Sequence, residues 1–253
     1  MLKKQEMQDS MNFKDTIRIG CCGWAEGQKK YYRDFDVIEV QETFYQPKKI
    51  ATYEKWRKTA PHSFEFTVKA WQLITHETTS PTYRKLKAPI PEGKKKRYGF
   101  FRPTDEVLAA WEVVDMIAQA LATKMILFQT PSSFMPSREN KQNLQKFFKK
   151  IDRRHYTLCW EPRDGWRDKD IKRICSKLDL VHCVDPFRSK PLSGRVVYFR
   201  LHGKPRYNLR YRYTREDLQE LSRMIGQKRV CVLFNNLNML HDAKRFQRLI
   251  AGI

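Results

Sequence analysis

The stretch VVYFRLHG, residues 196–203, is the pattern from which the fold of this chain is predicted. Apolar Val197, Phe199 and Leu201 alternate with polar residues at every second position: Tyr198, Arg200 and His202. Alternation of this kind puts the two sets on opposite faces of a β-strand. Residues 196–203 are therefore predicted to be a strand with one face in an apolar core and ionisable groups on the other.

Seven further runs resemble this one: residues 17–24, 37–45, 64–71, 124–131, 156–163, 178–186 and 230–236. Most are separated by helical patterns, so the strands should lie parallel, and eight is the number that closes a (β/α)8 TIM-type barrel. An open doubly wound sheet is the alternative. We expect a flexible leader over residues 1–16 and one barrel domain over 17–253.

Three helices carry start signals. Thr104 can cap a helix through Ala122, Ser137 can cap residues 138–150, and Thr214 resembles a capping box with Asp217. Residues 242–250 are predicted to be the last helix. Residues 187–195 are too few for a full helix, so the crossover between strands six and seven should be degenerate. The longest connection, residues 72–123, holds a basic insertion whose KKKR run at 94–97 is predicted to be a solvated loop.

Charge and composition narrow the function classes. Fifty Lys and Arg against 28 Asp and Glu give +22, which favours a nucleic-acid partner, RNA or DNA, with anionic lipid as the second choice. A high-salt or thermophilic cytosol would explain the charge without a partner. No apolar run is long enough to cross a membrane. The six cysteines form no C-x-x-C pair, so we expect buried thiols and a cytoplasmic protein.

The polar parity of the predicted strands puts ionisable groups in the barrel lumen near its carboxyl end, where TIM barrels carry their active sites. The candidates for catalysis are Glu39 and Glu161 as acid and base and His202 as proton shuttle, with Lys69 and Arg200 as groups that hold anionic oxygens. Lys69 is also a candidate for Schiff-base chemistry if burial lowers its pKa. The alternative is an internal ionic layer, in which the two glutamates only neutralise Lys69 and Arg200.

The exit of the 196–203 strand interleaves cations with aromatic rings. This loop contains the predicted nucleic-acid contacts Lys204, Arg206, Tyr207, Arg210, Tyr211 and Arg212. Arg and Lys suit phosphates, and Tyr suits stacking on bases or sugars. In the alternative interpretation the tyrosines pack against the protein and the cations are merely solvated.

Metal and cofactor signals are weak. Glu39, His76, Glu161, Asp185 and His202 offer oxygen and nitrogen ligands, but no H-x-H or H-E-x-x-H spacing supports them. A divalent metal is possible but not favoured, and no metal ligands are assigned. The loop after the first predicted strand is not G-x-G-x-x-G, so no nicotinamide or flavin site is indicated, and the sequence requires no cofactor.

Taken together, the strand-end motifs resemble one family. They are GCCGW at 20–24, EVQETFY at 39–45, FTVKA at 66–70, ITHE at 74–77, FQTP at 128–131, WEPR at 160–163, YFRLHG at 198–203 and FNN at 234–236. This order is similar to the YecE-like family, also called domain of unknown function 72, and GFFRPT at 99–104 resembles its archaeal branch. The resemblance implies a TIM-type barrel similar in shape to endonuclease IV, without the zinc ligands of that enzyme. Cys21 and Cys22 stand where the family usually has small hydroxyl residues.

Three hypotheses follow. The first is an enzyme with hydrolase-type acid/base chemistry on nucleic acid or a nucleotide-derived anion. The second is a nucleic-acid-binding protein without catalysis. The third is a barrel enzyme for a small phosphorylated or acidic metabolite. The predicted substrate contacts are Trp24, Thr43, Tyr45, His76, Gln129, Arg163, Arg200 and Asn235. The oligomeric state is left open.

Overall fold

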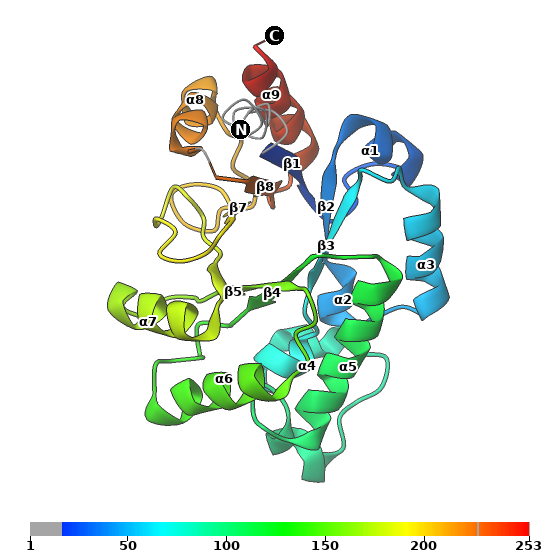
Figure 1. Ribbon diagram of the computed structural model, residues 1–253, viewed down its shortest axis with the longest axis vertical. Coiled ribbons are helices and arrows are strands. Elements are labelled where there is room, and N and C mark those ends of the chain that lie inside the picture. Colours follow the sequence, from blue (N-terminus) through cyan, green and yellow to red (C-terminus); the bar gives the residue numbers. More distant parts are fainter. Residues whose placement is uncertain (1–16, 227, 253) are drawn as a thin grey trace, which may run out of the picture.

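A computed structural model describes residues 17–226 and 228–252, so the predicted leader lies outside the described residues. Its sheet has eight strands in the order β6-β5-β4-β3-β2-β1-β8-β7, and every ladder between neighbours is parallel. The strands are β1 Ile17–Cys22, β2 Val37–Val40, β3 Glu65–Lys69, β4 Met125–Gln129, β5 Thr157–Glu161, β6 Val181–His182, β7 Val197–Leu201 and β8 Val230–Phe234. The helices surround the central strands (Figure 1). The prediction of a (β/α)8 TIM-type barrel is confirmed.

The barrel closes between β6 and β7 through one short contact. Val184 forms an isolated parallel bridge with Phe199. The Val184 amide donates to the Tyr198 carbonyl at 3.1 Å, and the Arg200 amide donates to the Val184 carbonyl at 2.9 Å. Within the described residues no helix lies between β6 and β7, which confirms the degenerate crossover. The strand predicted over 178–186 is shorter than expected, because Leu178 completes the buried stripe of the preceding helix.

The helices are α1 Gln28–Asp34, α2 Glu42–Tyr45, α3 Ile50–Thr59, α4 Gln72–Thr75, α5 Asp105–Ala120, α6 Arg138–Lys150, α7 Asp168–Leu178, α8 Arg215–Met224 and α9 Met239–Ala251. The predicted caps are present. Thr104 and Ser137 accept backbone hydrogen bonds at the starts of α5 and α6, and Thr214 with Asp217 forms a full capping box on α8. The last helix begins three residues earlier than predicted.

The alternation of side chains produces two apolar clusters. The outward set, which includes Val40, Val68 and Trp160, packs with the helices in a large outer core. The inward set fills the lumen as a smaller cluster: Cys22, Val37, Met125, Leu127, Cys159, Val181, Cys183, Tyr198, Cys231 and Leu233. All six cysteines are free and buried, as predicted, and four of them lie in the lumen. The apolar lumen forms a floor below the charged groups.

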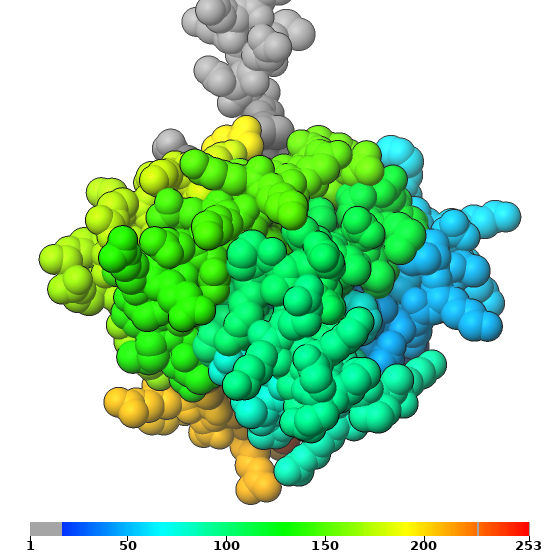
Figure 2. Space-filling model, turned by 90° about the horizontal axis from the view of Figure 1, so that it is seen from below, coloured from blue at the N-terminus to red at the C-terminus, as the bar shows by residue number. Residues whose placement is uncertain are grey.

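The basic insertion is folded against the barrel rather than extended. The insertion contains two 3-10 helices, η3 Pro81–Lys85 and η4 Glu92–Arg97. After them, the backbone amides of Gly99 and Phe101 donate hydrogen bonds to carbonyls of α4 at 2.8 and 2.9 Å. The KKKR run forms η4, not the predicted loop; it is exposed, and Arg97 pairs with Glu106 at 2.6 Å. Seen from below, this region, α5 and α6 form one continuous surface (Figure 2). None of the helices in residues 17–226 and 228–252 combines the length and apolarity needed to cross a membrane.

Candidate active site

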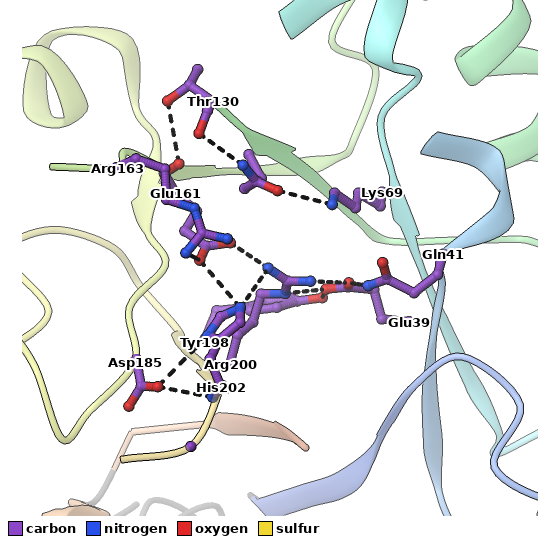
Figure 3. Close-up of polar contacts among 12 residues, drawn as sticks. Glu39, Gln41, Lys69, Thr130, Glu161, Arg163, Asp185, Tyr198, Arg200 and His202 are labelled. Atoms are coloured by element: carbon purple, nitrogen blue, oxygen red, sulfur yellow. Dashed lines mark hydrogen bonds and ion pairs between the residues drawn. The ribbon is translucent and has the colours of Figure 1, made fainter. Parts of the chain in front are cut away.

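A buried arginine lies at the centre of the charged layer. Arg200 on β7 donates from Nε and Nη2 to both oxygens of Glu39 on β2, at 3.0 and 2.9 Å, and from Nη1 to Glu161 on β5. The side chains of Arg200, Glu39 and Glu161 are 1%, 0% and 4% exposed. Figure 3 shows Arg200 extended between the two carboxylates. Charges this deeply buried are tolerated only when they are paired, and here three strands supply the pairing.

Glu39 has no free oxygen to offer a substrate. Besides Arg200, its carboxylate accepts a hydrogen bond from the Tyr198 hydroxyl at 2.8 Å and one from the Gln41 side-chain amide. Tyr198 is fixed in turn by Thr67, 2.8 Å away. This half of the layer corresponds to the ionic layer considered from the sequence. Glu39 therefore holds Arg200 in position.

Glu161 faces the mouth of the barrel and remains ionised. Burial alone would raise the pKa of this carboxyl, but Arg163 and Arg200 outweigh that effect and hold it well below its usual range. Arg163 Nη1 lies 3.4 Å from Glu161 Oε1. The same Nη1 is buried and makes no hydrogen bond with any residue of the described chain. Arg163 thus carries a buried donor whose hydrogen-bonding capacity the described residues leave unsatisfied.

His202 is held beside this pair. Its backbone amide donates to Asp185 at 2.9 Å, and its Nδ1 lies 3.6 Å from the same carboxylate. Its Nε2 lies 3.3 Å from an Arg200 nitrogen, which can only donate, so Nε2 is the acceptor and Nδ1 carries the proton. Burial lowers the pKa of His202, so the ring is neutral. The His202 Nδ1 is buried and makes no hydrogen bond within the described residues, so Asp185 holds this residue through its backbone amide.

Lys69, at the end of β3, is the unpaired cation of the site. Its Nζ donates to Gln129 Oε1 at 2.9 Å and lies 3.8 Å from the centre of the Phe44 ring. No carboxylate of the described residues lies within ion-pair distance of it. Burial, reinforced by the charge of Arg200, lowers the pKa of Lys69 to about 7. Near neutral pH a large fraction of this amine is uncharged.

Lys69, Arg163, Arg200 and His202 line a cavity of about 560 Å³ at the carboxyl end of the barrel, whereas the predicted catalytic residues Glu39 and Glu161 are not part of its lining. Of the predicted site residues, it brings together Tyr45, Lys69, His76, Gln129, Arg163, Arg200, His202, Tyr207 and Asn235. Lys69, Arg163 and Arg200 outnumber the one acidic residue in the lining, Asp164. Burial lowers the pKa of His76 to about 3, so it contributes a neutral ring. Since Arg163 and Arg200 are paired with Glu161 and Glu39, protonated Lys69 is the group of the lining whose charge an anion would neutralise.

Two predicted substrate contacts lie elsewhere. Trp24 packs edge-to-face on Tyr31, Tyr32 and Trp56 on the helix side of the barrel. Thr43 is fully buried, and its hydroxyl bonds the carbonyls of Val40 and Lys69 at 2.8 and 2.7 Å. The strand predicted over 37–45 ends at Val40, and Thr43 belongs to α2. Here Thr43 joins the ends of β2 and β3, and neither residue lines the cavity.

The 204–213 loop divides into packed and free residues. Lys204 pairs with Asp217 at 2.7 Å, and the Tyr211 hydroxyl donates to the same carboxylate at 2.6 Å. These two residues tie the loop to α8. By contrast, the exposed side chains of Arg206, Arg210 and Arg212 make no ion pair or hydrogen bond within the described residues.

Tyr207 covers the cavity from this loop. The guanidinium groups of Arg163 and Arg188 lie 4.0 and 4.3 Å from its ring centre, and its ring meets His202 edge-on at 5.0 Å. Sequence reasoning missed Arg188 and the hydrogen bond from the His202 amide to Asp185, which it weighed only as a metal ligand. Arg188 and Asp185 lie in the irregular segment after β6, where no periodicity exists to reveal them. Among the described residues no three His, Cys, Asp or Glu side chains are grouped so as to hold a metal ion.

Comparison with known proteins gives the family. The family model described as "Protein of unknown function DUF72" matches residues 18–252. The chain belongs to the DUF72 family. The UPF0759 protein YunF of Bacillus subtilis is 24% identical and covers 87% of this chain and 88% of its own length. The expected family is thereby confirmed; its archaeal branch stays a prediction.

Solved structures agree with the barrel. A DUF72 family protein from Enterococcus faecalis superposes with a TM-score of 0.68 at 19% identity, covering 94% of this chain and 98% of that one. Endonuclease IV from Thermus thermophilus gives a TM-score of 0.54 at 10% identity, covering 93% and 100%. The predicted similarity in shape to endonuclease IV is confirmed. At these identities the likeness concerns the fold alone.

Proposed function

We propose that this DUF72 protein is an enzyme that hydrolyses nucleic acid or a nucleotide-derived anion in the cavity at the carboxyl end of its barrel. The observation that carries the proposal is the set of cationic donors at the cavity and on the loop beside it. Within residues 17–226 and 228–252, Arg163 has a buried donor without a hydrogen bond, Lys69 has no carboxylate partner, and three unpaired arginines lie on the adjoining loop. Such a surface suits a phosphate chain that enters along the loop and ends in the cavity.

The contacts suggest a division of roles. Arg163 and Arg200 would hold anionic oxygens of the substrate. Lys69, with a pKa of about 7, is the group suited to proton transfer near neutral pH, and the neutral His202 ring lines the same cavity. Glu161 would keep Arg163 and His202 in place, and Glu39 would do the same for Arg200. Asn235, whose side chain lines the cavity, would orient the substrate by hydrogen bonds.

The test is binding and turnover of end-labelled RNA and DNA oligonucleotides by protein purified in high salt. We expect salt-sensitive binding, and cleavage that Glu161→Gln reduces by at least about 100-fold, since loss of positioned electrostatic groups typically has that effect. Binding should survive in this variant. The matched control is Glu139→Gln, an exposed carboxylate on α6, which should cut normally.

Each alternative has its own outcome. Binding without cleavage would replace the proposal with the non-catalytic nucleic-acid-binding protein. Indifference to RNA and DNA at low salt, with binding of phosphorylated metabolites instead, would favour the small-molecule enzyme. A fully active Glu161→Gln variant would refute the assignment of the catalytic site.

A further inference from the structure

Lys69 differs from every other cation at the site in its partners. Arg200 contacts two carboxylates, and Arg163 contacts one. Lys69 Nζ instead has one amide oxygen, that of Gln129, and an aromatic face, that of Phe44. The residue is 5% exposed, yet it lines the cavity. A buried amine with a neutral hydrogen-bond acceptor and access to a cavity is arranged for use as the free base.

Burial has the largest effect on the pKa of the amine, and the charges around it act in opposite directions, the arginines lowering the pKa and the glutamates raising it. Two positive groups face it, Arg200 and Arg163, and two negative ones, Glu39 and Glu161, which those arginines already pair. The neighbouring His76 is neutral. With a pKa of about 7, roughly three quarters of Lys69 is uncharged at pH 7.5, against about one part in a thousand for an ordinary lysine.

We propose that Lys69 Nζ is a nucleophile that forms an imine with the aldehyde or ketone group of an anionic substrate. The nitrogen lone pair attacks the carbonyl carbon, and the carbonyl π electrons move to the oxygen. A proton transfer from nitrogen to oxygen gives a carbinolamine. This loses water to leave a C=N bond, so both hydrogens of the neutral amine leave in the water and no oxidant or reductant is needed. Lysines activated by desolvation react in this way.

The cavity supplies what such a substrate needs besides the amine. Arg163 lines the same cavity, its Nη1 makes no hydrogen bond within the described residues, and a guanidinium suits a phosphate or carboxylate. His76 has Nδ1 on the Thr75 hydroxyl at 2.8 Å, and its Nε2 makes no hydrogen bond with the described residues, so Nε2 is left for the carbinolamine hydroxyl. The substrate class is therefore a carbonyl compound that carries an anionic group. The inference rests on the function proposed above only where the carbonyl compound is part of a nucleic acid.

The experiment traps the imine on the full chain. Protein is incubated at pH 7.5 with glyceraldehyde 3-phosphate in one arm and with an oligonucleotide carrying one abasic aldehyde in the other. Borohydride then reduces the C=N bond to a stable amine, and peptide mass spectrometry locates the adduct. We expect Lys69 to be labelled at least ten-fold faster than the exposed Lys172 and Lys177, and glyceraldehyde without phosphate to label it at least ten-fold more slowly.

The labelled lysines are located in the natural protein, so this result does not depend on whether a variant folds. Lys69→Met adds a check, since it should lose the fast adduct and keep the slow ones. Labelling of Lys69 in either arm supports the inference, and the arm that reacts identifies the source of the aldehyde. Exposed lysines labelled while Lys69 stays free would overturn it. Cleavage of RNA or DNA with Lys69 unlabelled would refute the imine alone and leave the proposed function standing.

Discussion

Replacing Lys69 by methionine should stabilise the protein, and the gain should depend on pH. Methionine keeps the length and apolar body of the side chain but cannot be protonated. In the folded protein the pKa of Lys69 is about 7, against an ordinary 10.5. That difference corresponds to roughly 5 kcal/mol, taken at 1.36 kcal/mol for each pH unit. Lys69 therefore lowers the free energy of unfolding at every pH at which the unfolded chain binds the lysine proton more strongly than the folded chain does.

The direction of the pH dependence follows from proton counts. Between pH 7 and 10.5 the unfolded state binds more protons at Lys69, so the natural protein becomes more stable as pH rises. Its penalty falls from roughly 5 kcal/mol at pH 6 to roughly 2 kcal/mol at pH 9. The lost hydrogen bond to Gln129 subtracts about 1 kcal/mol from the gain of the variant. Lys69→Met should thus be more stable by about 4 kcal/mol at pH 6 and about 1 kcal/mol at pH 9.

The assay is urea unfolding of both proteins at pH 6 and pH 9. Taking the difference between the two proteins cancels the titration of all groups that they share. Lys172→Met, an exposed position on α7, serves as the control and should change the free energy of unfolding by less than about 0.5 kcal/mol at either pH. A gain that is equal at both pH values, or that grows toward pH 9, would refute the reasoning.

Three further predictions concern other contacts. Glu39→Gln leaves a buried guanidinium with one carboxylate and should lower the free energy of unfolding by about 3–5 kcal/mol, measured in urea; a loss under about 1 kcal/mol would contradict this. Replacing Arg206, Arg210 and Arg212 by Ala should reduce the slope of log affinity against log salt for duplex DNA by up to about 3, near 0.9 for each phosphate contact; an unchanged slope would mean that the loop does not touch the backbone. Asp217→Asn removes half of a capping box and should cost about 1 kcal/mol and speed proteolysis of the 204–213 loop; equal proteolysis rates would show that the loop is held by other contacts.

The alternation of side chains predicted the lumen correctly because a strand allows only two faces. Glu39, Lys69, Glu161 and Arg200 all point inward, as their parity required. Their partners could not be read from parity. Which charges meet across a barrel depends on the stagger between strands and on side-chain length, and neither leaves a local pattern. The choice of Arg200, rather than Lys69, as the partner of both glutamates is of this kind.

Predictions failed where a strand ended earlier than its apolar pattern. The chain leaves β1 at Gly23, whose φ of +102° is accessible mainly to glycine, so strand parity stops there and Trp24 turns outward. In the same way β2 ends at Val40, and α2 places Thr43 between two strand ends. Short turns of this kind are set by tertiary hydrogen bonds, which the local sequence does not encode.

The charge balance of the site leads to a last prediction, on anion binding. Glu39 and Glu161 pair with Arg200 and Arg163, so within the part of the chain that the structure describes the proton on Lys69 has no counter-charge until an anion enters the cavity. A bound anion should therefore raise the pKa of Lys69 and draw a proton onto it. Burial lowers the pKa of His76 to about 3 and that of His202 below its usual value, so both rings stay neutral above pH 7. Proton uptake on anion binding is therefore expected at Lys69.

Sulfate is a suitable probe because it does not titrate in this range. Its affinity, followed by NMR shifts of cavity residues, should rise as pH falls from 9 to 7, by up to about ten-fold per pH unit if one proton is taken up. Lys69→Met should bind sulfate without this dependence. A sulfate affinity that does not change with pH in the natural protein, or that still rises as pH falls in the variant, would mean that Lys69 is not the group that takes up a proton when the anion binds. Lys69 would then belong to the internal ionic layer rather than to the centre of the site.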